Sequence, residues 1–403
     1  MRPGDRLEIH LPAGFRFSAG SAGIKASGRP DLALVESAPA TTATAMFTSN
    51  RVVAAPIEVG RESLLASRGR VRALIVNSGN ANCATGPAGI RNCKAVCSAL
   101  AGLLQVSPQE VFPSSTGIIG VPLPVEKVVS QLPELVAKRA ATHKAVRAFA
   151  EAIMTTDTKP KIASARFVAN HRTINMLGIA KGSGMIHPQL ATMLVYLFTD
   201  LVATPAQLKR LLRNTCSGTF NCISVDGDTS TNDTVLLMAS GESGVHVRDA
   251  AVEAKFHNAL LGVCRSLSEQ IVADGEGVKH VVRLKIEQAR TRDEAMQIAR
   301  TIAHSLLVKT AFAGADPNWG RILAAVGRSG VPVNPRRVNI FIGSELVCRG
   351  GVSLPFPAIK VHAEMSKPNY EIRIRLGRGR ATATYLTTDL TTDYVRINAE
   401  YST

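Results

Sequence analysis

The chain has 403 residues, of which 45% are hydrophobic and 4% aromatic, and it carries a formal net charge of +16. This length predicts two domains or one large one, with a core built mainly from Ala, Val, Leu and Ile. The most apolar window, residues 190–198, ends before Asp200 and is far shorter than the ~20 residues that a membrane-spanning helix needs. No apolar secretion signal follows Met1, so we expect a soluble, cytoplasmic protein without a membrane partner.

Hydrophobic periodicity predicts a mixture of helices and strands along the chain. The expected helices include residues 89–104, 125–154 with a break at Pro133, 204–212, 250–273 and 292–309. The expected strands include residues 71–76, 163–169, 192–198, 234–238, 338–342 and 371–376. Short turns between successive strands favour a layered α/β fold with much antiparallel pairing.

The cysteines and the basic residues bear on two questions: whether the chain binds a metal and whether it binds an anionic partner. Seven cysteines stand at scattered spacings without a second Cys/His pair at zinc-site spacing, which indicates buried, reduced thiols and no metal. The positive charge would attract anions, including nucleic acid, a phosphorylated carrier or acidic metabolites. The densest basic cluster, Arg373, Arg375, Arg378 and Arg380, lies on an alternating strand pattern that is typical of a solvated face. We therefore expect no nucleic-acid partner. A basic nucleic-acid-binding protein that retains the fold is the alternative function.

The chemically informative segment is residues 178–194, which contains three glycines, Pro188 and the pair Ala191-Thr192. Glycine permits backbone conformations with positive φ, and proline fixes φ shortly before the pair. The Thr192 hydroxyl could attack the preceding carbonyl, and hydrolysis of the resulting ester would leave Thr192 as a new N-terminus. Its α-amine, with an ordinary pKa of about 7.7–8.0, could then act as general base for the hydroxyl beside it. An ordinary glycine-rich turn is the competing interpretation.

Residues 181–194 resemble the self-processing site of the ornithine acetyltransferase (glutamate N-acetyltransferase) family, and further strings of that family follow in order over almost the whole chain. They are Ala22-Gly-Ile-Lys25, Asp31-Leu-Ala-Leu34, Asn77-Ser-Gly-Asn-Ala-Asn82, Ser115-Thr-Gly-Ile118, Met154-Thr-Thr-Asp-Thr158, Val225-Asp-Gly-Asp-Thr-Ser-Thr-Asn-Asp233, Asp274-Gly-Glu-Gly277, Asp316-Pro-Asn-Trp-Gly-Arg321 and Ile397-Asn-Ala-Glu-Tyr401.

The resemblance implies an α/β (α+β) fold, a layered αββα sandwich shared with self-processing aminopeptidases. A cut between Ala191 and Thr192 would give an α chain (1–191) and a β chain (192–403), interlocked rather than independent domains, in a heterotetramer of two α and two β chains. Thr192 would carry acetyl in a ping-pong transfer from N-acetylornithine to glutamate, a step of arginine biosynthesis. No metal or organic cofactor is implied, and acetyl-CoA stays open as a second donor.

The family's functional positions fall on chemically suitable residues. Thr192 matches the nucleophile, and Thr116 and Gly117 match the oxyanion hole, which binds the negative oxygen of the tetrahedral intermediate. The substrate-binding positions are matched by Thr155, Lys181, Thr192, Glu276, Asn398 and Thr403. An amino-acid substrate needs a cation, an anion and neutral hydrogen-bonding groups around it, and this set supplies all three. The motif leaves open which of Thr155, Thr156 and Thr158 makes the contact.

Three alternative interpretations concern particular residues. A self-processing aminopeptidase would carry serine at the position of Thr192. Residues 226–233 resemble a calcium loop, but Thr231 and Leu237 stand where such a loop needs glycine and glutamate, so we expect a hydrogen-bonded turn that shapes the pocket. His187 lies close enough in sequence to act as a base, but the family mechanism does not use it.

Overall fold

The computed structural model describes residues 8–186 and 193–400. Within these ranges, none of the helices is both long and apolar enough to cross a membrane. All seven cysteines are free and buried, as the sequence predicted.

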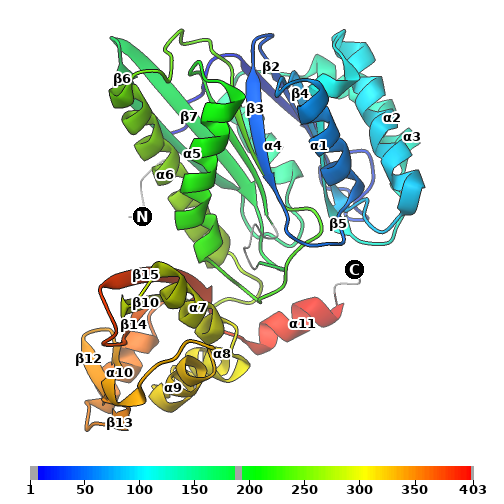
Figure 1. The fold of residues 1–403 in the computed structure, drawn as a ribbon. Helices are drawn as coiled ribbons and strands as arrows, with labels where there is room; N and C mark the ends of the chain where they lie inside the picture. Colours follow the sequence, from blue (N-terminus) through cyan, green and yellow to red (C-terminus); the bar gives the residue numbers. More distant parts are fainter. Residues whose placement is uncertain (1–7, 187–192, 401–403) are drawn as a thin grey trace.

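Two mixed sheets face each other at the centre of the larger part of the molecule (Figure 1). The first has the order β1-β2-β4-β5 and the second the order β3-β9-β8-β7-β6. Their strands are β1 (Phe15–Gly20), β2 (Leu32–Ser37), β3 (Thr42–Phe47), β4 (Ala73–Asn80), β5 (Val111–Ile118), β6 (Lys161–Ala169), β7 (Arg172–Lys181), β8 (Leu194–Thr199) and β9 (Thr234–Ala239). Most pairs are antiparallel, as predicted, while β4–β5 and β8–β9 are parallel.

Aromatic side chains gather in the core between these sheets. Phe198 of β8 contacts Phe15 and Phe17 of β1 edge-on, with ring centroids 5.1 and 5.3 Å apart. Phe149 contacts Phe17 and Tyr196 in the same way. The prediction of an aliphatic core is therefore incomplete, because the few aromatic residues of the chain are concentrated where large rings can fill the space between two sheets.

Helices cover the outer faces of both sheets. On the first sheet lie α1 (Ala55–Ala66), α2 (Gly86–Leu104) and α3 (Val125–Ala137), and on the second lie α5 (Pro205–Gly218) and α6 (Ala250–Ala273). Helix α4 (His143–Ala152) contacts β1 and β2 and adds side chains to the core between the sheets. The layered αββα sandwich that the sequence predicted is confirmed.

Local sequence signals account for several helix ends. Thr204 and Gln207 form a reciprocal capping box at the start of α5, and α6 has the predicted bounds. The break expected at Pro133 is wrong, since Pro133 lies inside α3. Proline removes one helical hydrogen bond, and the buried Leu132 and Leu135 hold the turns around it on the sheet. The helix expected over residues 292–309 is instead two helices, α7 (Arg292–Ala303) and α8 (Leu306–Ala313).

The C-terminal part of the chain forms a third sheet, which the sequence did not predict. Its order is β13-β12-β11-β14-β10-β15, and it packs with α7 to α10 around an apolar core of its own. The remaining elements are β10 (Val281–Ala289), α9 (Trp319–Gly327), β11 (Asn339–Ile342), β12 (Glu345–Arg349), β13 (Val352–Ser353), α10 (Ala358–Met365), β14 (Asn369–Arg375), β15 (Ala381–Thr388) and α11 (Thr392–Glu400). Figure 1 shows this C-terminal unit beside one end of the sandwich, with α11 leading back along that end.

Buried polar contacts join the C-terminal unit to the sandwich. The Tyr385 hydroxyl donates to the Ile223 carbonyl at 2.9 Å, and the Thr388 hydroxyl donates to the Val225 carbonyl at 3.1 Å. Lys309 donates in turn to the Thr388 hydroxyl at 3.0 Å. Strand β15 therefore holds the turn that leads into the acidic loop described below.

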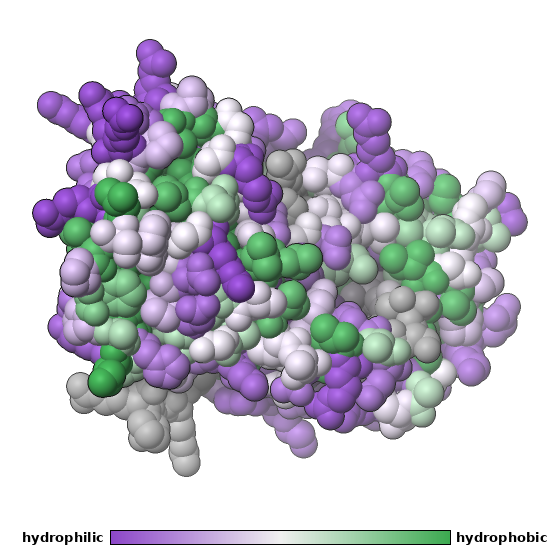
Figure 2. Space-filling view, turned by 90° about the horizontal axis from the view of Figure 1, so that it is seen from below, coloured by the Kyte–Doolittle hydropathy of each residue, from purple (hydrophilic) through white to green (hydrophobic). Residues whose placement is uncertain are grey.

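The basic cluster at the end of β14 is partly covered. The guanidinium groups of Arg373 and Arg375 lie over the Phe341 ring, 4.8 and 5.0 Å from its centroid, and Arg375 pairs with Glu287 at 2.9 Å. The prediction of a freely solvated arginine face is therefore only partly right. Figure 2 shows one face of the molecule, on which apolar residues lie in separate patches among hydrophilic ones.

Candidate functional site

A pocket opens where segments from both sheets meet. Its walls are formed by Thr116, Gly117, Ile119, Thr155, Thr156, Lys181, Gly184, Met185, Ser230, Thr231, Asn232, Glu276 and Asn398. The pocket thus brings together six of the positions that the family strings indicated, Thr116, Gly117, Thr155, Lys181, Glu276 and Asn398. The predicted positions Ala191, Thr192 and Thr403, and also His187, lie outside the described residues.

Thr116 and Gly117 lie near the end of β5, where the parallel pairing with β4 shifts register at Gly79 and Asn80. Gly117 has a φ of +134°, and a Cβ at this position would lie 2.3 Å from the Gly79 carbonyl carbon. Any other residue would therefore be strained and would also clash with the neighbouring strand. The glycine permits the close approach of the two strands beside Thr116 in the pocket wall.

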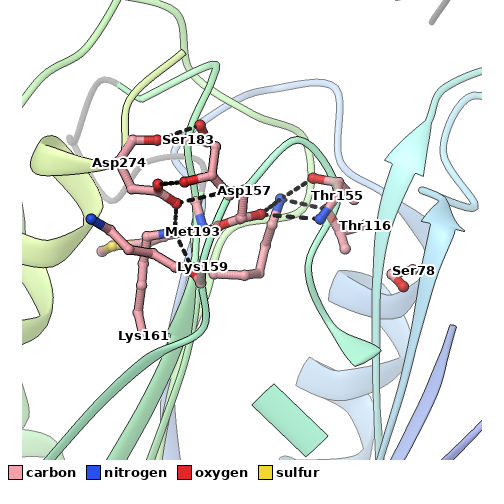
Figure 3. Close-up of polar contacts among 12 residues, drawn as sticks. Ser78, Thr116, Thr155, Asp157, Lys159, Lys161, Ser183, Met193 and Asp274 are labelled. Atoms are coloured by element: carbon pink, nitrogen blue, oxygen red, sulfur yellow. Dashed lines mark hydrogen bonds and ion pairs between the residues drawn. The ribbon is translucent and has the colours of Figure 1, made fainter. Parts of the chain in front are cut away.

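Lys181, the last residue of β7, is the buried cation of the pocket wall. Its Nζ donates to Thr155 Oγ1 at 2.8 Å and to Thr116 Oγ1 at 3.1 Å, and it lies 4.0 Å from the Asp157 carboxylate. Figure 3 shows Thr116 and Thr155 side by side next to Asp157. Burial lowers the pKa of Lys181, and the nearby Asp157 carboxylate opposes that shift.

A buried ion network lies behind Lys181. Lys161 Nζ is 2.6 Å from both the Asp157 and the Asp274 carboxylates, and Asp157 also accepts from the Gly182 N–H at 2.7 Å. Burial by itself raises the pKa of Asp157, but Lys181 and Lys161 outweigh it and hold the pKa at about 2. The network fixes the backbone from which Lys181 enters the pocket.

Sequence reasoning missed this network. The family strings contained both carboxylates but assigned them no role, and Lys161 stands outside every string. Lys161 and Asp274 are 113 residues apart in the chain. The Asp157–Lys161 spacing of four residues was a weak signal, because that spacing indicates a contact only inside a helix, whereas Lys161 begins a strand.

The three candidate threonines have different surroundings. Thr155 and Thr156 both line the pocket, and Thr155 also accepts from Lys181. Thr158 instead donates both its hydroxyl and its N–H to the Asp274 carboxylate. Thr158 therefore supports the ion network, and of the three only Thr155 and Thr156 line the pocket.

Glu276 supplies the negative charge of the pocket wall. Its carboxylate accepts from the Asn398 side chain at 2.8 Å, which ties α11 to the pocket. A Cβ on Gly184 would lie 2.4 Å from both Glu276 carboxylate oxygens. The Glu276 carboxylate therefore occupies space that is open only because residue 184 is a glycine.

The acidic loop, residues 226–233, contacts both described flanks of residues 187–192. Asp226 accepts from the N–H groups of Met185 and Ile186, and Asp233 accepts from the Met193 N–H at 2.8 Å. Burial raises the pKa of Asp226 to about 6 and that of Asp233 well above its usual range. The loop shapes the pocket through hydrogen bonds, as predicted.

No cluster of three or more His, Cys, Asp or Glu suited to a metal ion occurs in the part of the chain that the structure describes.

The αββα sandwich with a charged pocket at the meeting of its two sheets places this chain in the class of layered α/β proteins. The model of the ArgJ family matches residues 16–403, and the chain belongs to that family. A relative from Methylococcus capsulatus is 45% identical over 97% of this chain and 96% of its own length, and one from Thermus thermophilus is 46% identical over 98% and 100%. Each is named arginine biosynthesis bifunctional protein ArgJ. A crystal structure of the protein of that name from Bacillus halodurans is 38% identical, covers 51% of this chain and 98% of its own, and has a TM-score of 0.49.

Proposed function

We propose that the enzyme transfers acetyl from N-acetylornithine to glutamate through an ester on Thr192, giving ornithine and N-acetylglutamate in arginine biosynthesis. The pocket carries this proposal, because it collects Thr116, Gly117, Lys181 and Glu276 from segments far apart in the chain. The names of the relatives at 45% and 46% identity support the place in arginine biosynthesis.

Self-cleavage comes first in the proposed sequence. The Thr192 hydroxyl attacks the Ala191 carbonyl, the peptide C–N bond breaks, and the hydroxyl proton ends on the released amine. Water then hydrolyses the ester, which leaves the Ala191 carboxylate and a free threonine N-terminus. The products are an α chain (1–191) and a β chain (192–403), which assemble as a heterotetramer of two copies each. The contacts of Asp226 and Asp233 support this step, since they hold Ile186 and Met193, the described residues on either side of the segment.

Acetyl transfer then uses the same hydroxyl. The freed α-amine takes the Thr192 proton as the hydroxyl attacks the acetyl carbonyl, and it returns a proton to the departing amine of ornithine. The Thr116 hydroxyl and the Gly117 N–H stabilise the negative oxygen of the intermediate. Glu276 offers its carboxylate to the substrate ammonium, while Thr155, Thr156, Asn398 and Thr403 supply neutral hydrogen bonds. Glutamate then takes the acetyl group from the ester, so no cofactor is required.

Thr192→Ala tests the proposal most directly. We expect two chains in the intact-mass spectrum of the wild-type protein, and a single uncut chain without acetyl transfer in the variant, because alanine can neither attack nor carry acetyl. Thr173→Ala is the matched control, because Thr173 is exposed at the start of β7, at the opposite end of the strand from Lys181, and the change should leave both cleavage and transfer in place. A wild-type chain that is uncut yet fully active would contradict the mechanism. The same assay with acetyl-CoA in place of N-acetylornithine tests the second donor.

A further inference from the structure

A hydrogen-bond relay connects α8 and β15 of the C-terminal unit to the turn before the acidic loop. Lys309 Nζ donates to the Thr388 hydroxyl at 3.0 Å and also to the Thr388 carbonyl. The Thr388 hydroxyl lies 3.1 Å from the Val225 carbonyl. An ammonium group only donates and a carbonyl only accepts, so the hydroxyl between them must accept from Lys309 and donate to Val225. The chemistry of its two ends therefore fixes the direction of the relay.

Val225 and Asp226 hold both backbone polar groups of Ile186. The Val225 N–H donates to the Ile186 carbonyl at 2.8 Å, and the Ser224 hydroxyl donates to the same carbonyl at 2.9 Å. The Asp226 carboxylate accepts from the Ile186 N–H at 2.8 Å. Ile186 is buried and is the last described residue before the segment that contains the proposed cut. The relay from α8 and β15 therefore reaches the N-terminal flank of that segment.

The buried position of Lys309 carries a cost that packing does not explain. The residue is 3% exposed, and both of its acceptors on Thr388 are uncharged groups. Burial lowers the pKa of Lys309 to about 8, although the carboxylates of Asp226 and Asp389 oppose that shift. An uncharged side chain would fill this space without the desolvation of an ammonium group. The cation contributes through the relay instead, because a positive charge behind a hydroxyl strengthens the hydrogen bond that the hydroxyl donates.

We propose that Lys309 is a positioning residue for self-cleavage, which acts through Thr388 and Val225 to fix Ile186 on the N-terminal side of the cut. The inference rests on the proposed function, since the cleavage it serves belongs to that function. Orientation of the reacting groups accounts for a large part of the rate of an intramolecular attack. After the peptide bond is broken, no amide has to be aligned. Acetyl transfer by the cut enzyme should therefore not depend on Lys309.

The rate of cleavage, measured separately from the rate of acetyl transfer, tests this role. The full chain is made by cell-free translation and its cleavage is followed over time by intact mass, and kcat is measured per mole of cut chain. Lys309→Met should slow cleavage about tenfold or more and leave kcat within about twofold of the wild-type value.

The Thr388 hydroxyl offers an independent test of the same relay. Thr388→Val keeps the shape of the side chain without its hydroxyl and should slow cleavage by a similar factor, whereas Thr388→Ser restores the hydroxyl and should cleave at close to the wild-type rate. Combined with Lys309→Met, Thr388→Val should slow cleavage by less than about twofold further, because both changes break the same relay. Multiplied effects in the double variant would overturn the inference.

Tyr385→Phe is the matched control, since Tyr385 is also buried on β15 and donates to a carbonyl of the same turn, that of Ile223 at 2.9 Å. It should lower the melting temperature, as Thr388→Val does, but leave the cleavage rate within about threefold. Equal slowing by these two variants, or cleavage of Lys309→Met at the wild-type rate, would overturn the inference.

If Lys309→Met does not fold, the two Thr388 variants decide, and equal cleavage rates for valine and serine would overturn the inference. A wild-type chain that is never cut, or that is cut but transfers no acetyl, would instead refute the proposed function.

Discussion

The αββα sandwich and the C-terminal unit treat charged side chains differently. In the sandwich, Lys161 lies buried between Asp157 and Asp274. In the C-terminal unit, ion pairs such as Lys360–Glu345 are open to solvent, with 65% of the lysine side chain exposed. Burying a charged group costs free energy of folding unless the group is paired. Buried ions are therefore expected mainly where they also support a functional site. Here the network lies behind Lys181 in the pocket wall, so the cost of burying these ions is spent beside the candidate site.

The contrast between the two regions fails if the buried network contributes no more to the free energy of unfolding than a surface ion pair does. Lys161→Met leaves Asp157 and Asp274 buried without their shared cation, and we expect a loss of about 3–5 kcal/mol in the free energy of unfolding. Urea denaturation followed by circular dichroism measures this loss. Lys161→Arg, which keeps the charge, should recover part of it. A loss below about 1 kcal/mol for the methionine variant would show that the carboxylates find other partners.

A second prediction sharpens the comparison within the sandwich, through Asp226. Because the folded-state pKa of about 6 lies above the ordinary value of 3.8, the folded protein binds a proton more tightly than the unfolded chain. Stability should therefore fall as the pH rises from about 4 to about 6, by about 2–3 kcal/mol for this group. Asp226→Asn should remove that part of the slope when the free energy of unfolding is measured across this range. Parallel curves for wild type and variant would show that Asp226 keeps an ordinary pKa.

The smallest effect on stability is expected for an exposed ion pair of the C-terminal unit. Lys360→Met removes the exposed partner of Glu345, and we expect the melting temperature to move by about 1–2 °C at most. Differential scanning calorimetry at low and at moderate salt gives the measurement, since added salt should shrink even that difference. A shift as large as that of Lys161→Met would remove the contrast between the two regions.

The sequence was most informative where the deciding interactions are local. The capping box of Thr204 and Gln207 and the amphipathic run of α6 lie within a few residues, and both helices form where expected. Pro133 misled the prediction, because its neighbours Leu132 and Leu135 pack on a sheet that no local pattern reveals. The third sheet was missed for a similar reason: β10 pairs with β14 and β15, about ninety residues further along the chain.

For the candidate site, too, the sequence predicted some features and missed others. The family strings identified Thr116, Lys181 and Glu276, which all line one pocket, although their spacing alone could not bring them together. The contacts among pocket residues were beyond reach, because Lys181 and Thr116 are 65 residues apart in the chain. Side-chain hydrogen bonds of this kind depend on the register of β5 and β7 in different sheets, which a motif does not encode.

The strand order of the second sheet has a consequence for how the protein could be made. A cut between Ala191 and Thr192 would assign β3, β7 and β6 to one chain and β9 and β8 to the other, in the order β3-β9-β8-β7-β6. Neither fragment would own the whole of this sheet, since β9 and β8 separate β3 from its own chain's β7 and β6. Separately synthesised halves would each expose unpaired strand edges, which invite aggregation. A chain that folds in one piece before such a cut would keep these strand edges paired throughout.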